Sequence, residues 1–569
     1  MSGSGPPPGE SLEPHPPPPA SEPSEAPGWV GSPGPASDDG APVGTGPPGI
    51  GRLLGSASLL SLGNILSRLM GFVRDRVLAT TVGPGLELDA FLLAAKVPTH
   101  LYTLLIGGQL SAALVPVLAA YRAGPVEALR RAASVLLSVA AVVTGLAALG
   151  VYAFADPIAG VLADGMGAEG ITAVAGALRI LAPSALLFGI GGVLTGLLLS
   201  QERFRGPALA GAVYNLGVIA TLWLAYGRLG FVALPIGVVL GSGGQLLLLA
   251  LGARDLRLRP SFDLRHRALR RVLVLYAPIA LGLLATDVLL PTLDGYYSSH
   301  AGLAARSWLD LATRLTQLPH GLITVAISLA ILPTLAAAHA RGEGITFART
   351  LSRGGRMVMA LTLPAAVGLA ALADPVTGLA FQAGAFGDAD RLGVALALRV
   401  FLLGLPFAAI DWPLNYAFYA RGNTWLPALV GLGSFVPWWL VAQLVGHPAD
   451  IGVAPGAAFA ILAAADSAKH LAHAGTMYVL VRRNVGPTAV AGFGRTTLLA
   501  GLAALGMGAV VLWMDGLLAG ALQDGISAWA IRVGLGAGVG AVVYAALAAR
   551  LGVAEIGWFS DQVRARLRR

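Results

Sequence analysis

Apolar stretches of about 20–30 residues recur along the chain from residue 52 onward, and short polar loops separate them. A helix needs about 20 apolar residues to cross a bilayer, so each stretch is long enough to span a membrane. The pattern predicts an all-α polytopic membrane protein. Fourteen transmembrane helices are expected, with approximate spans 54–80, 88–120, 132–155, 171–200, 207–226, 230–252, 272–296, 306–338, 346–373, 392–420, 424–445, 453–481, 496–516 and 527–549.

The distribution of basic residues predicts how these helices are oriented. If the N-terminus lies in the cytoplasm, the loops and tails on that side hold 26 of the 38 lysines and arginines. The opposite loops hold 3, namely Arg228, Arg306 and Arg391. This asymmetry satisfies the positive-inside rule. We therefore expect a multi-pass protein of the cytoplasmic (inner) membrane with both termini in the cytoplasm.

Composition excludes several classes of protein. The 569 residues are 55% hydrophobic and 12% charged, about half the charged share of a typical soluble protein. There is no cysteine, which excludes disulfides, thiolate metal sites and a cysteine nucleophile. The motifs Gly-x-x-x-x-Gly-Lys-[Ser/Thr] and His-Glu-x-x-His are also missing. We therefore expect a protein that is not an enzyme and that uses no cofactor or metal. We also expect no nucleic-acid partner, because cytoplasmic arginines explain the formal charge of +8.

The first 50 residues differ from the rest of the chain. Residues 1–49 contain 15 prolines and six acids but no lysine or arginine. Such a segment buries too little apolar surface to offset its ordering entropy, so a disordered cytoplasmic tail is predicted for residues 1–50. Its polyproline stretch Pro16–Pro19 leaves open the alternative of a partner-binding segment.

The remaining chain repeats itself at an offset of 217–220 residues. Four features recur: residues 115–120 as 332–337, residues 155–160 as 373–378, Arg179 as Arg399, and Pro207 as Pro427. The repeat predicts two parallel six-helix units, an N-lobe at 51–253 and a C-lobe at 254–482, followed by two extra helices and a basic tail at 483–569. Two related halves around a central site are a common transporter plan.

The first apolar stretch contains charges that lipid does not tolerate. An arginine at the bilayer centre costs about 2.5–3.5 kcal/mol on insertion scales, so such residues face a polar interior. One arc of about 120° on this helix holds Asn64, Ser67, Arg68, Gly71, Arg74 and Asp75. This polar, cationic face predicts one wall of an anion site. Arg76 points the other way and is expected to snorkel or to close the helix end.

Other charges lie within the predicted spans. Asp89 and Lys96 share one face of the second helix, and Asp310 and Arg314 have the i,i+4 spacing of an ion pair. A structural anchor is favoured for Arg179 and Arg399, and snorkelling is favoured for Arg532. The sequences Asp156-Pro and Asp374-Pro are predicted to be structural turn or cap elements. A solvated helix end and a proton relay stay equally open for Asp466, Lys469, His470 and His473.

Three motifs resemble the MurJ (MviN) family of lipid II flippases, within the multidrug/oligosaccharidyl-lipid/polysaccharide exporter superfamily. The motifs are Ser67-Arg-Leu-Met-Gly-Phe-Val-Arg-Asp, Leu88-Asp-Ala-Phe-Leu-Leu-Ala-Ala-Lys-Val-Pro with Val115-Pro-Val-Leu, and Arg314-Leu-Thr-Gln-Leu-Pro-His-Gly. The resemblance covers roughly residues 52–550. It implies alternating access, with a cationic cavity in which Arg68, Arg74 and Arg314 bind the diphosphate of a polyprenyl-linked sugar.

The resemblance also implies roles for acids and a driving force. Asp75 and Asp89 would act as gating or orienting acids, with Asn64, Ser67 and Lys96 completing the substrate site. In some family members an acid of the seventh helix is a sodium ligand. Asp294 matches its position, and Asp287, on the same helix, is the second candidate ion ligand. Membrane potential, protons or sodium would drive the cycle.

Two alternatives to a lipid II flippase stay open. One is a flippase for another polyprenyl-linked polysaccharide precursor, and the other is a non-transporting scaffold that recruits cell-wall synthesis proteins through the Pro-rich tail.

Overall fold

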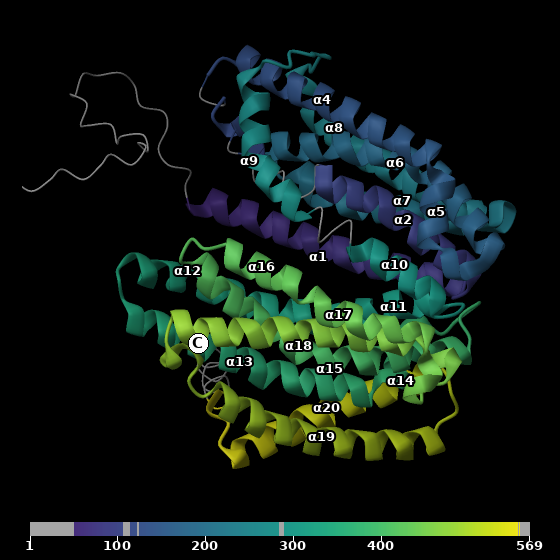
Figure 1. The fold of residues 1–569 in the computed structure, drawn as a ribbon, viewed down its shortest axis with the longest axis vertical. Helices are drawn as coiled ribbons and strands as arrows, with labels where there is room; N and C mark the ends of the chain where they lie inside the picture. The colour runs from purple at the N-terminus through teal and green to yellow at the C-terminus, as the bar shows by residue number, and fades with distance from the viewer. Residues whose placement is uncertain are drawn as a thin grey trace, which may run out of the picture. The chain divides into compact units, whose positions relative to one another are not determined.

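The structure is a computed structural model that describes residues 50–105, 114–115, 117–121, 124–283, 290–555 and 557. In these ranges every regular element is a helix (Figure 1). Nine helical segments of the described chain are long and apolar enough to cross a membrane, and one of them, Arg205–Leu256, contains two successive helices. The predicted all-α, polytopic membrane architecture is confirmed. The count of fourteen spans stays a prediction, and residues 1–49 lie outside the described ranges.

Contacts within the chain define two units, Met1–Leu54 and Gly55–Arg569. The first unit contains the first residues of helix α1 (Ile50–Thr81). The second unit contains the rest of α1 and all the other helices. Its first half comprises α2 (Leu86–Leu105), α4 (Val126–Ala153), α5 (Ala155–Leu162), η1 (Asp164–Met166), α6 (Gly167–Ser200), α7 (Arg205–Leu229), η2 (Gly230–Val232), α8 (Ala233–Ala253) and η3 (Arg254–Leu256).

The second half is longer. It comprises α9 (Arg267–Leu283), α10 (Leu290–His300), α11 (Ala305–Pro319), η5 (His320–Val325), α12 (Ala326–Ala340), α13 (Gly344–Ala371), α14 (Ala373–Phe381), α15 (Asp388–Tyr419), α16 (Trp425–Gly433), α17 (Phe435–Ala442), η6 (Gln443–Gly446), η7 (Pro448–Ile451), η8 (Pro455–Ala457), α18 (Phe459–Asn484), η9 (Pro487–Val490), α19 (Phe493–Ala521) and α20 (Ile526–Leu551).

The helices pack as two bundles, each around its own apolar cores. Helices α2 and α4–α8 form the N-lobe, and α10–α20 form the C-lobe. Helix α1 belongs to both, because Leu78 packs in an N-lobe core while Ala79 packs in a C-lobe core. Figure 1 shows α1 running between the two groups. Helix α9 packs into the N-lobe core around Leu129, although the sequence repeat assigns it to the second unit.

Glycines allow some of these helices to approach closely. A Cβ atom at Gly217 of α7 would lie 2.6 Å from the Cα atom of Gly241 in α8, so neither helix tolerates a side chain at this crossing. Lipid offers no hydrophobic driving force between helices, so close van der Waals packing of small residues is a main source of helix association in a membrane. The pair α7 and α8 is held in this way.

The expected span 306–338 is interrupted. Helix α11 ends at Pro319, and residues His320–Val325 form a π-helical segment before α12 begins. Proline has no N–H to donate and its ring displaces the preceding turn, which explains the change of helix type inside the continuous helical segment Ala305–Ala340. Single π-helical turns inside longer helices frequently mark functional sites.

The repeat is visible in the backbone at two short helices. Helices α4 and α13 end at residues of nearly equal dihedral angles, Phe154 (φ −102°, ψ 22°) and Leu372 (φ −96°, ψ 15°). The Asp-Pro sequences that follow, predicted as turn or cap elements, lie at the start of helices α5 and α14. Both sequences suit a helix start, because proline is tolerated in the first turn and an acid there favours the helix dipole.

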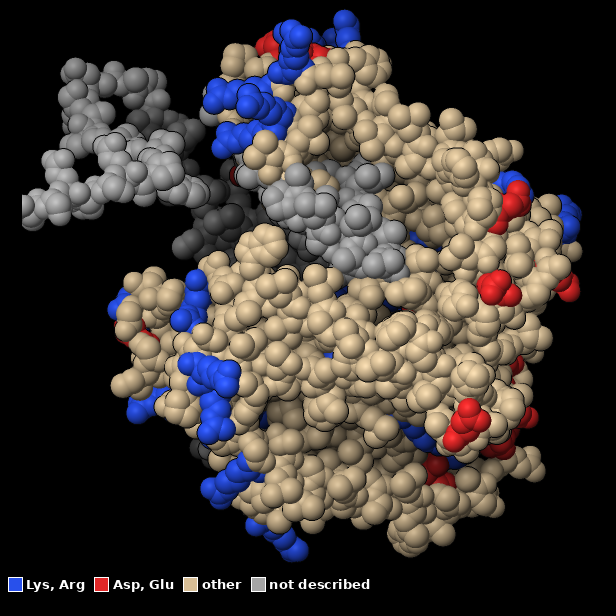
Figure 2. Space-filling model, viewed as in Figure 1, with Lys and Arg blue, Asp and Glu red and all other residues tan. Residues whose placement is uncertain are grey.

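Charged side chains gather at the two ends of the bundle. In Figure 2, most of the blue Lys and Arg side chains lie along the left edge, and most of the red Asp and Glu side chains lie along the right edge together with some blue ones. A largely uncharged band separates the two edges. Such a band is what a bilayer-spanning surface presents. The end of the bundle where α1 ends and α2 begins is called the gate end below.

Candidate functional site

The polar face of α1 is fixed to the N-lobe by α7. Arg74 donates to Oδ1 of Asn215 over 3.0 Å and binds its neighbour Asp75 through Nε (3.0 Å) and Nη2 (2.7 Å). The amide of Asn215 in turn donates to the carbonyl oxygens of Ser67 (3.2 Å) and Gly211 (2.9 Å). Ser67 and Arg74, predicted from sequence to share one face, therefore contact the same asparagine.

Asp75 also reaches the other lobe. Its Oδ2 atom lies 3.3 Å from Nε of Arg314 on α11, and the same nitrogen lies 3.4 Å from Oδ2 of Asp310. The predicted ion pair between Asp310 and Arg314 is thus confirmed. Nε of Arg314 is buried and makes no hydrogen bond to any described residue, so these contacts are looser than those of Arg74. One carboxylate, Asp75, joins two arginines from different lobes.

The ion pairs continue toward the gate end. Arg306 lies 3.8 Å from Asp310 and 2.5 Å from Asp294, and Lys96 of α2 lies 3.0 Å from the same Asp294 oxygen. The result is a continuous inter-lobe ion chain of four cations and three acids, with a net formal charge of +1. Its members are Lys96, Asp294, Arg306, Asp310, Arg314, Asp75 and Arg74.

Arg306 was missed by the sequence analysis, which placed it in an external loop. It is buried in the structure. The i,i+4 spacing to Asp310 was the available signal. Asp294, predicted as an ion ligand, forms ion pairs with Lys96 and Arg306 in this structure.

Asp89 acts as a cap across the interface. Its carboxylate accepts hydrogen bonds from the backbone N–H of Ser307, over 2.7 Å, and from the hydroxyl of the same residue. Ser307 lies in the first turn of α11, where unpaired N–H groups and the helix dipole favour an anion. An acid of the N-lobe thus holds a helix terminus of the C-lobe.

Arg76 provides the complementary contact at a helix C-terminus. Its Nη1 atom donates to the carbonyl oxygens of Leu379 and Ala380, each over 2.8 Å, at the end of α14. Of the two alternatives predicted for Arg76, snorkelling was wrong, because unpaired carbonyl groups at a helix end lie within its reach. Close by, the N–H of Ala385 donates to the carbonyl oxygen of Thr80 over 2.9 Å. The gate end is therefore closed by backbone as well as by side-chain contacts.

Arg68 is the exposed arginine of the predicted set. A methyl group added at Gly321 would lie 2.9 Å from its Nη1 atom, so the guanidinium reaches the π-helical segment η5 of the C-lobe. No ion pair joins Arg68 to another described residue. The side chain of Asn64 and all of Asp287 lie outside the described residues.

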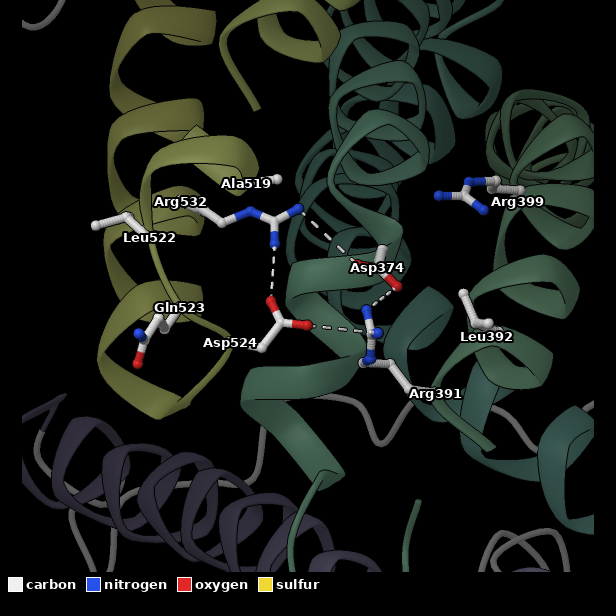
Figure 3. Close-up of a pocket in the computed structure, with 9 residues that line it drawn as sticks. All are labelled: Asp374, Arg391, Leu392, Arg399, Ala519, Leu522, Gln523, Asp524 and Arg532. Carbon is white, nitrogen blue, oxygen red and sulfur yellow. Dashed lines mark ion pairs between the residues drawn. The ribbon is translucent and has the colours of Figure 1, made fainter. Parts of the chain in front are cut away.

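A second group of ion pairs lies within the C-lobe, around a cavity of about 560 Å³ (Figure 3). Arg532 of α20 is buried and binds both carboxylate oxygens of Asp515, over 2.7 and 2.8 Å. It also lies 3.7 Å from Asp524 and 3.9 Å from Asp374. The snorkelling predicted for Arg532 was wrong, because α19 supplies a buried acid that pairs with it.

Arg391 completes this C-terminal network. It contacts Asp374, and its Nη2 atom lies 3.5 Å from Asp388 and 3.8 Å from Asp524. Sequence analysis had left Arg391 in a loop, although its i,i+3 spacing from Asp388 was a usable signal. The C-terminal network is defined by Asp374, Arg391, Asp515, Asp524 and Arg532.

Comparison with known proteins gives a consistent result. A family model described as "Lipid II flippase MurJ" matches residues 78–531. The probable lipid II flippase MurJ of Haemophilus influenzae is 30% identical over 396 residues, covering 65% of this chain and 77% of the relative. The corresponding Vibrio cholerae protein is 30% identical over 399 residues, covering 68% and 76%.

Solved structures show the same fold. A lipid II flippase MurJ in an inward closed conformation superposes with a TM-score of 0.72 at 22% identity, covering 89% of this chain and 99% of that one. An inward-facing multidrug resistance MATE family transporter of the MOP superfamily superposes with a TM-score of 0.59 at 15% identity, covering 74% and 94%.

Proposed function

This chain belongs to the lipid II flippase MurJ family, and we propose that it moves lipid II from the inner to the outer leaflet by alternating access. The observation that carries the proposal is Asp75, which bridges Arg74 of the N-lobe helix face and Arg314 of the C-lobe. A contact of this kind, between lobes and within a membrane, has two states. The lobes are joined when the arginines bind Asp75, and they are free to separate when the arginines bind something else.

A lipid diphosphate is the ligand that fits these arginines. It carries at least two negative charges that no bilayer core accepts, and arginine forks bind phosphate oxygens with two parallel hydrogen bonds. Arg68 is exposed, and Arg314 is held only by ion pairs of 3.3 and 3.4 Å. The diphosphate would replace Asp75 at Arg314, with Arg74 as the third cation and Ser67, Asn64 and Lys96 beside it.

Displacement of Asp75 would link substrate binding to the gate end. The ion chain continues from Arg314 through Asp310 and Arg306 to Asp294, the partner of Lys96. Loss of the Asp75–Arg314 contact removes one of its two bridges between the lobes, and the Lys96–Asp294 pair then remains as the other. Asp89, with its cap on α11, would be the last contact to open.

We place the gate end at the outer face of the cytoplasmic membrane, with both termini inside. Support comes from the loop arginines, of which 26 lie on one side and 3 on the other, and from the separated charged edges in Figure 2. In this orientation the structure is closed to the outside. Fourteen spans, two six-helix repeats and a pair of additional helices complete the proposed topology.

Complementation tests the function. A bacterial strain depleted of its essential lipid II flippase would receive the wild-type chain, Arg74→Ala, Arg314→Ala, Arg74→Lys and a deletion of residues 1–49. Arg179→Ala is the matched control, because it removes an exposed arginine that pairs with Asp156 inside one lobe. Membrane levels of every variant are measured by immunoblotting.

We expect growth with the wild type, the deletion and Arg179→Ala, and no growth with Arg74→Ala or Arg314→Ala. Arg74→Lys should rescue weakly, because lysine keeps the charge but loses the fork. Full rescue by both alanine variants would contradict the diphosphate assignment. A wild-type chain that reaches the membrane but fails to rescue would favour another polyprenyl-linked sugar. Loss of rescue on deletion of residues 1–49 alone would favour a scaffold for cell-wall synthesis proteins.

A further inference from the structure

A second cavity, of about 200 Å³, lies within the C-lobe between α11, α15 and α18. Its polar lining comes from the last turns of α11, the first residue of η5 and the middle of α18: Thr313, Thr316, Gln317, His320, Asp466 and His470. A water molecule occupies about 30 Å³ of liquid, so the cavity has room for several. It is separate from the inter-lobe ion chain but shares helix α11 with it.

The titratable groups around this cavity form one cluster. On α18, Asp466 contacts Lys469 and lies 3.4 Å from Nε2 of His470. One turn further, Nδ1 of His473 lies 2.6 Å from Oδ1 of Asp411 on α15. These pairs place four ionisable side chains of α18 on the face that meets α15 and η5.

The other faces of the cluster are largely uncharged. From η5, His320 packs edge-on against Trp412 at 5.9 Å between ring centroids. Nδ1 of His320 is buried and makes no hydrogen bond to any described residue. From α17, the ring of Phe435 lies 5.6 Å from Nζ of Lys469. Tyr419 of α15 also interacts with Asp411. The charged and titratable groups of the cluster are therefore Asp411, Asp466, Lys469, His320, His470, His473 and Tyr419.

The charge of this cluster requires a proton. Two carboxylates and one ammonium sum to −1 when the three histidines are neutral. An uncompensated charge within the bilayer is costly, so one protonated histidine stabilises the cluster. Histidine is the side chain whose unperturbed pKa, about 6.5, lies in the range where cells operate.

We propose that this cavity is a proton-binding site, in which one proton is shared by the histidines that face Asp466 and Asp411. Two of them, His470 and His473, are one turn apart on α18 and each is paired with an acid. The third, His320, lines the cavity, and its Nδ1 atom has no hydrogen-bond partner among the described residues. Water in the cavity would give the proton a path between His320 and His470, which both line it.

The π-helical segment connects this site to the substrate arginines. His320 begins η5, and the next residue, Gly321, lies against the guanidinium of Arg68. A charge gained or lost at His320 and His470 changes the repulsion between η5 and α18, and η5 moves against Arg68. Proton occupancy would thereby set the position of a diphosphate ligand. This coupling step rests on the proposed function, whereas the proton site itself does not.

The indole of Trp412 reports on the site in the purified full-length protein. A charged imidazolium beside an indole quenches its emission, so subtracting the Trp412→Phe signal from the wild type isolates one pH titration among the chain's ten tryptophans. Asp466→Asn should weaken proton binding about tenfold, which moves the midpoint by about one pH unit. His470→Gln should also move it. His447→Gln, in an exposed loop, is the matched control and should leave it unchanged.

A transport measurement then tests the coupling. Vesicles of phosphatidylethanolamine and phosphatidylglycerol carry the protein and fluorescent lipid II, with or without a proton gradient. A gradient should change the wild-type rate several-fold and leave the Asp466→Asn rate unchanged. A Trp412 signal without titration, or one indifferent to both Asp466→Asn and His470→Gln, overturns the proton site. A gradient response that survives Asp466→Asn overturns the coupling. A wild type that moves no lipid II contradicts the proposed function, while the fluorescence titration still decides the proton site.

Discussion

The inter-lobe ion chain and the C-terminal network use the same types of residue for different purposes. Both alternate arginines with aspartates, and both cross between helices. In the C-terminal network the arginines are nearly covered, since the side chains of Arg532 and Arg391 are 6% and 11% exposed. In the inter-lobe chain, Arg306 is as covered, at 7%, but Lys96, Asp294 and Arg314 are 26%, 33% and 36% exposed.

The geometry differs in the same direction. Arg532 holds Asp515 through two bonds of 2.7 and 2.8 Å, whereas Nε of Arg314 is shared between two acids at 3.3 and 3.4 Å. A buried, bidentate pair is lost only at high cost, while a half-exposed pair exchanges partners readily. The C-terminal network thus fixes α19 and α20 to the C-lobe, and the inter-lobe chain is suited to open and close.

The largest expected effect comes from preventing the inter-lobe contacts from opening. The chain has no cysteine, so Thr80→Cys with Ala385→Cys introduces one defined pair. The backbones of these residues are joined by a 2.9 Å hydrogen bond, which brings them close enough for a disulfide. Oxidation should abolish lipid II transport in vesicles, and reduction should restore it.

A second pair within one lobe controls for the chemistry. A Cβ atom at Gly237 would lie 3.4 Å from Cβ of Thr221, so Thr221→Cys with Gly237→Cys links α7 to α8 within the N-lobe and does not join the two lobes. This variant should transport equally well oxidised and reduced. Transport that persists with Thr80 and Ala385 fully cross-linked would show that the lobes do not separate at this end.

The two regions also differ in how far the sequence predicted them. The polar face of α1 follows from helical spacing alone, because Ser67, Arg74 and Asp75 are local to one apolar stretch. The pair Asp310–Arg314 followed from the i,i+4 rule. Most spans were located because runs of about 20 apolar residues are typical of membrane helices and rare in soluble proteins.

The partners across helices were not predictable in this way. Arg76, Arg306 and Arg532 were assigned to snorkelling or loops, yet each finds its partner 12 to 303 residues away. Sequence spacing alone does not show which residues that lie far apart in the chain contact each other. The break at Pro319 and the helices at the Asp-Pro sequences depend on packing around them, so they too emerged only from the structure.

The second largest effect is expected from Arg532→Ala, which breaks the C-terminal network. It leaves Asp515 buried without its partner, and removal of one member of a buried pair costs about 3–5 kcal/mol. The thermal unfolding midpoint of the detergent-solubilised protein should fall by several degrees. The double variant Arg532→Leu with Asp515→Leu should recover much of that loss, because it leaves no unpaired charge. An unchanged midpoint in Arg532→Ala would mean that the network does not hold α20.

A smaller effect is expected from Lys96→Met, which removes one bridge of the inter-lobe chain. Asp294 keeps Arg306 as a partner, so the expected cost is about 1 kcal/mol, or about fivefold in the population of separated lobes. Spin labels at Glu169→Cys and Asp450→Cys, exposed on different lobes, report that population by pulsed electron resonance. Arg131→Ala, which removes an exposed pair inside the N-lobe, should leave the distances unchanged. A Lys96→Met distribution identical to wild type would exclude Lys96 from closure.

The smallest effect is expected where the repeat has diverged. In the N-lobe, Asp156 pairs with Arg179 over 2.5 Å, and the equivalent residues of the C-lobe are Asp374 and Arg399. In the C-lobe, Asp374 forms ion pairs with Arg391 and Arg532 instead. Arg399 donates a 3.3 Å hydrogen bond to the carbonyl oxygen of Ala370.

Arg399 lines the 560 Å³ cavity in Figure 3 but pairs with no acid of the described chain. Arg399→Ala should therefore change the free energy of unfolding by less than about 0.5 kcal/mol, and Arg179→Ala by about 0.2–1 kcal/mol. Both are measured by the same thermal unfolding. If Arg399→Ala instead cost as much as Arg532→Ala, the C-terminal network would extend across the whole cavity to Arg399.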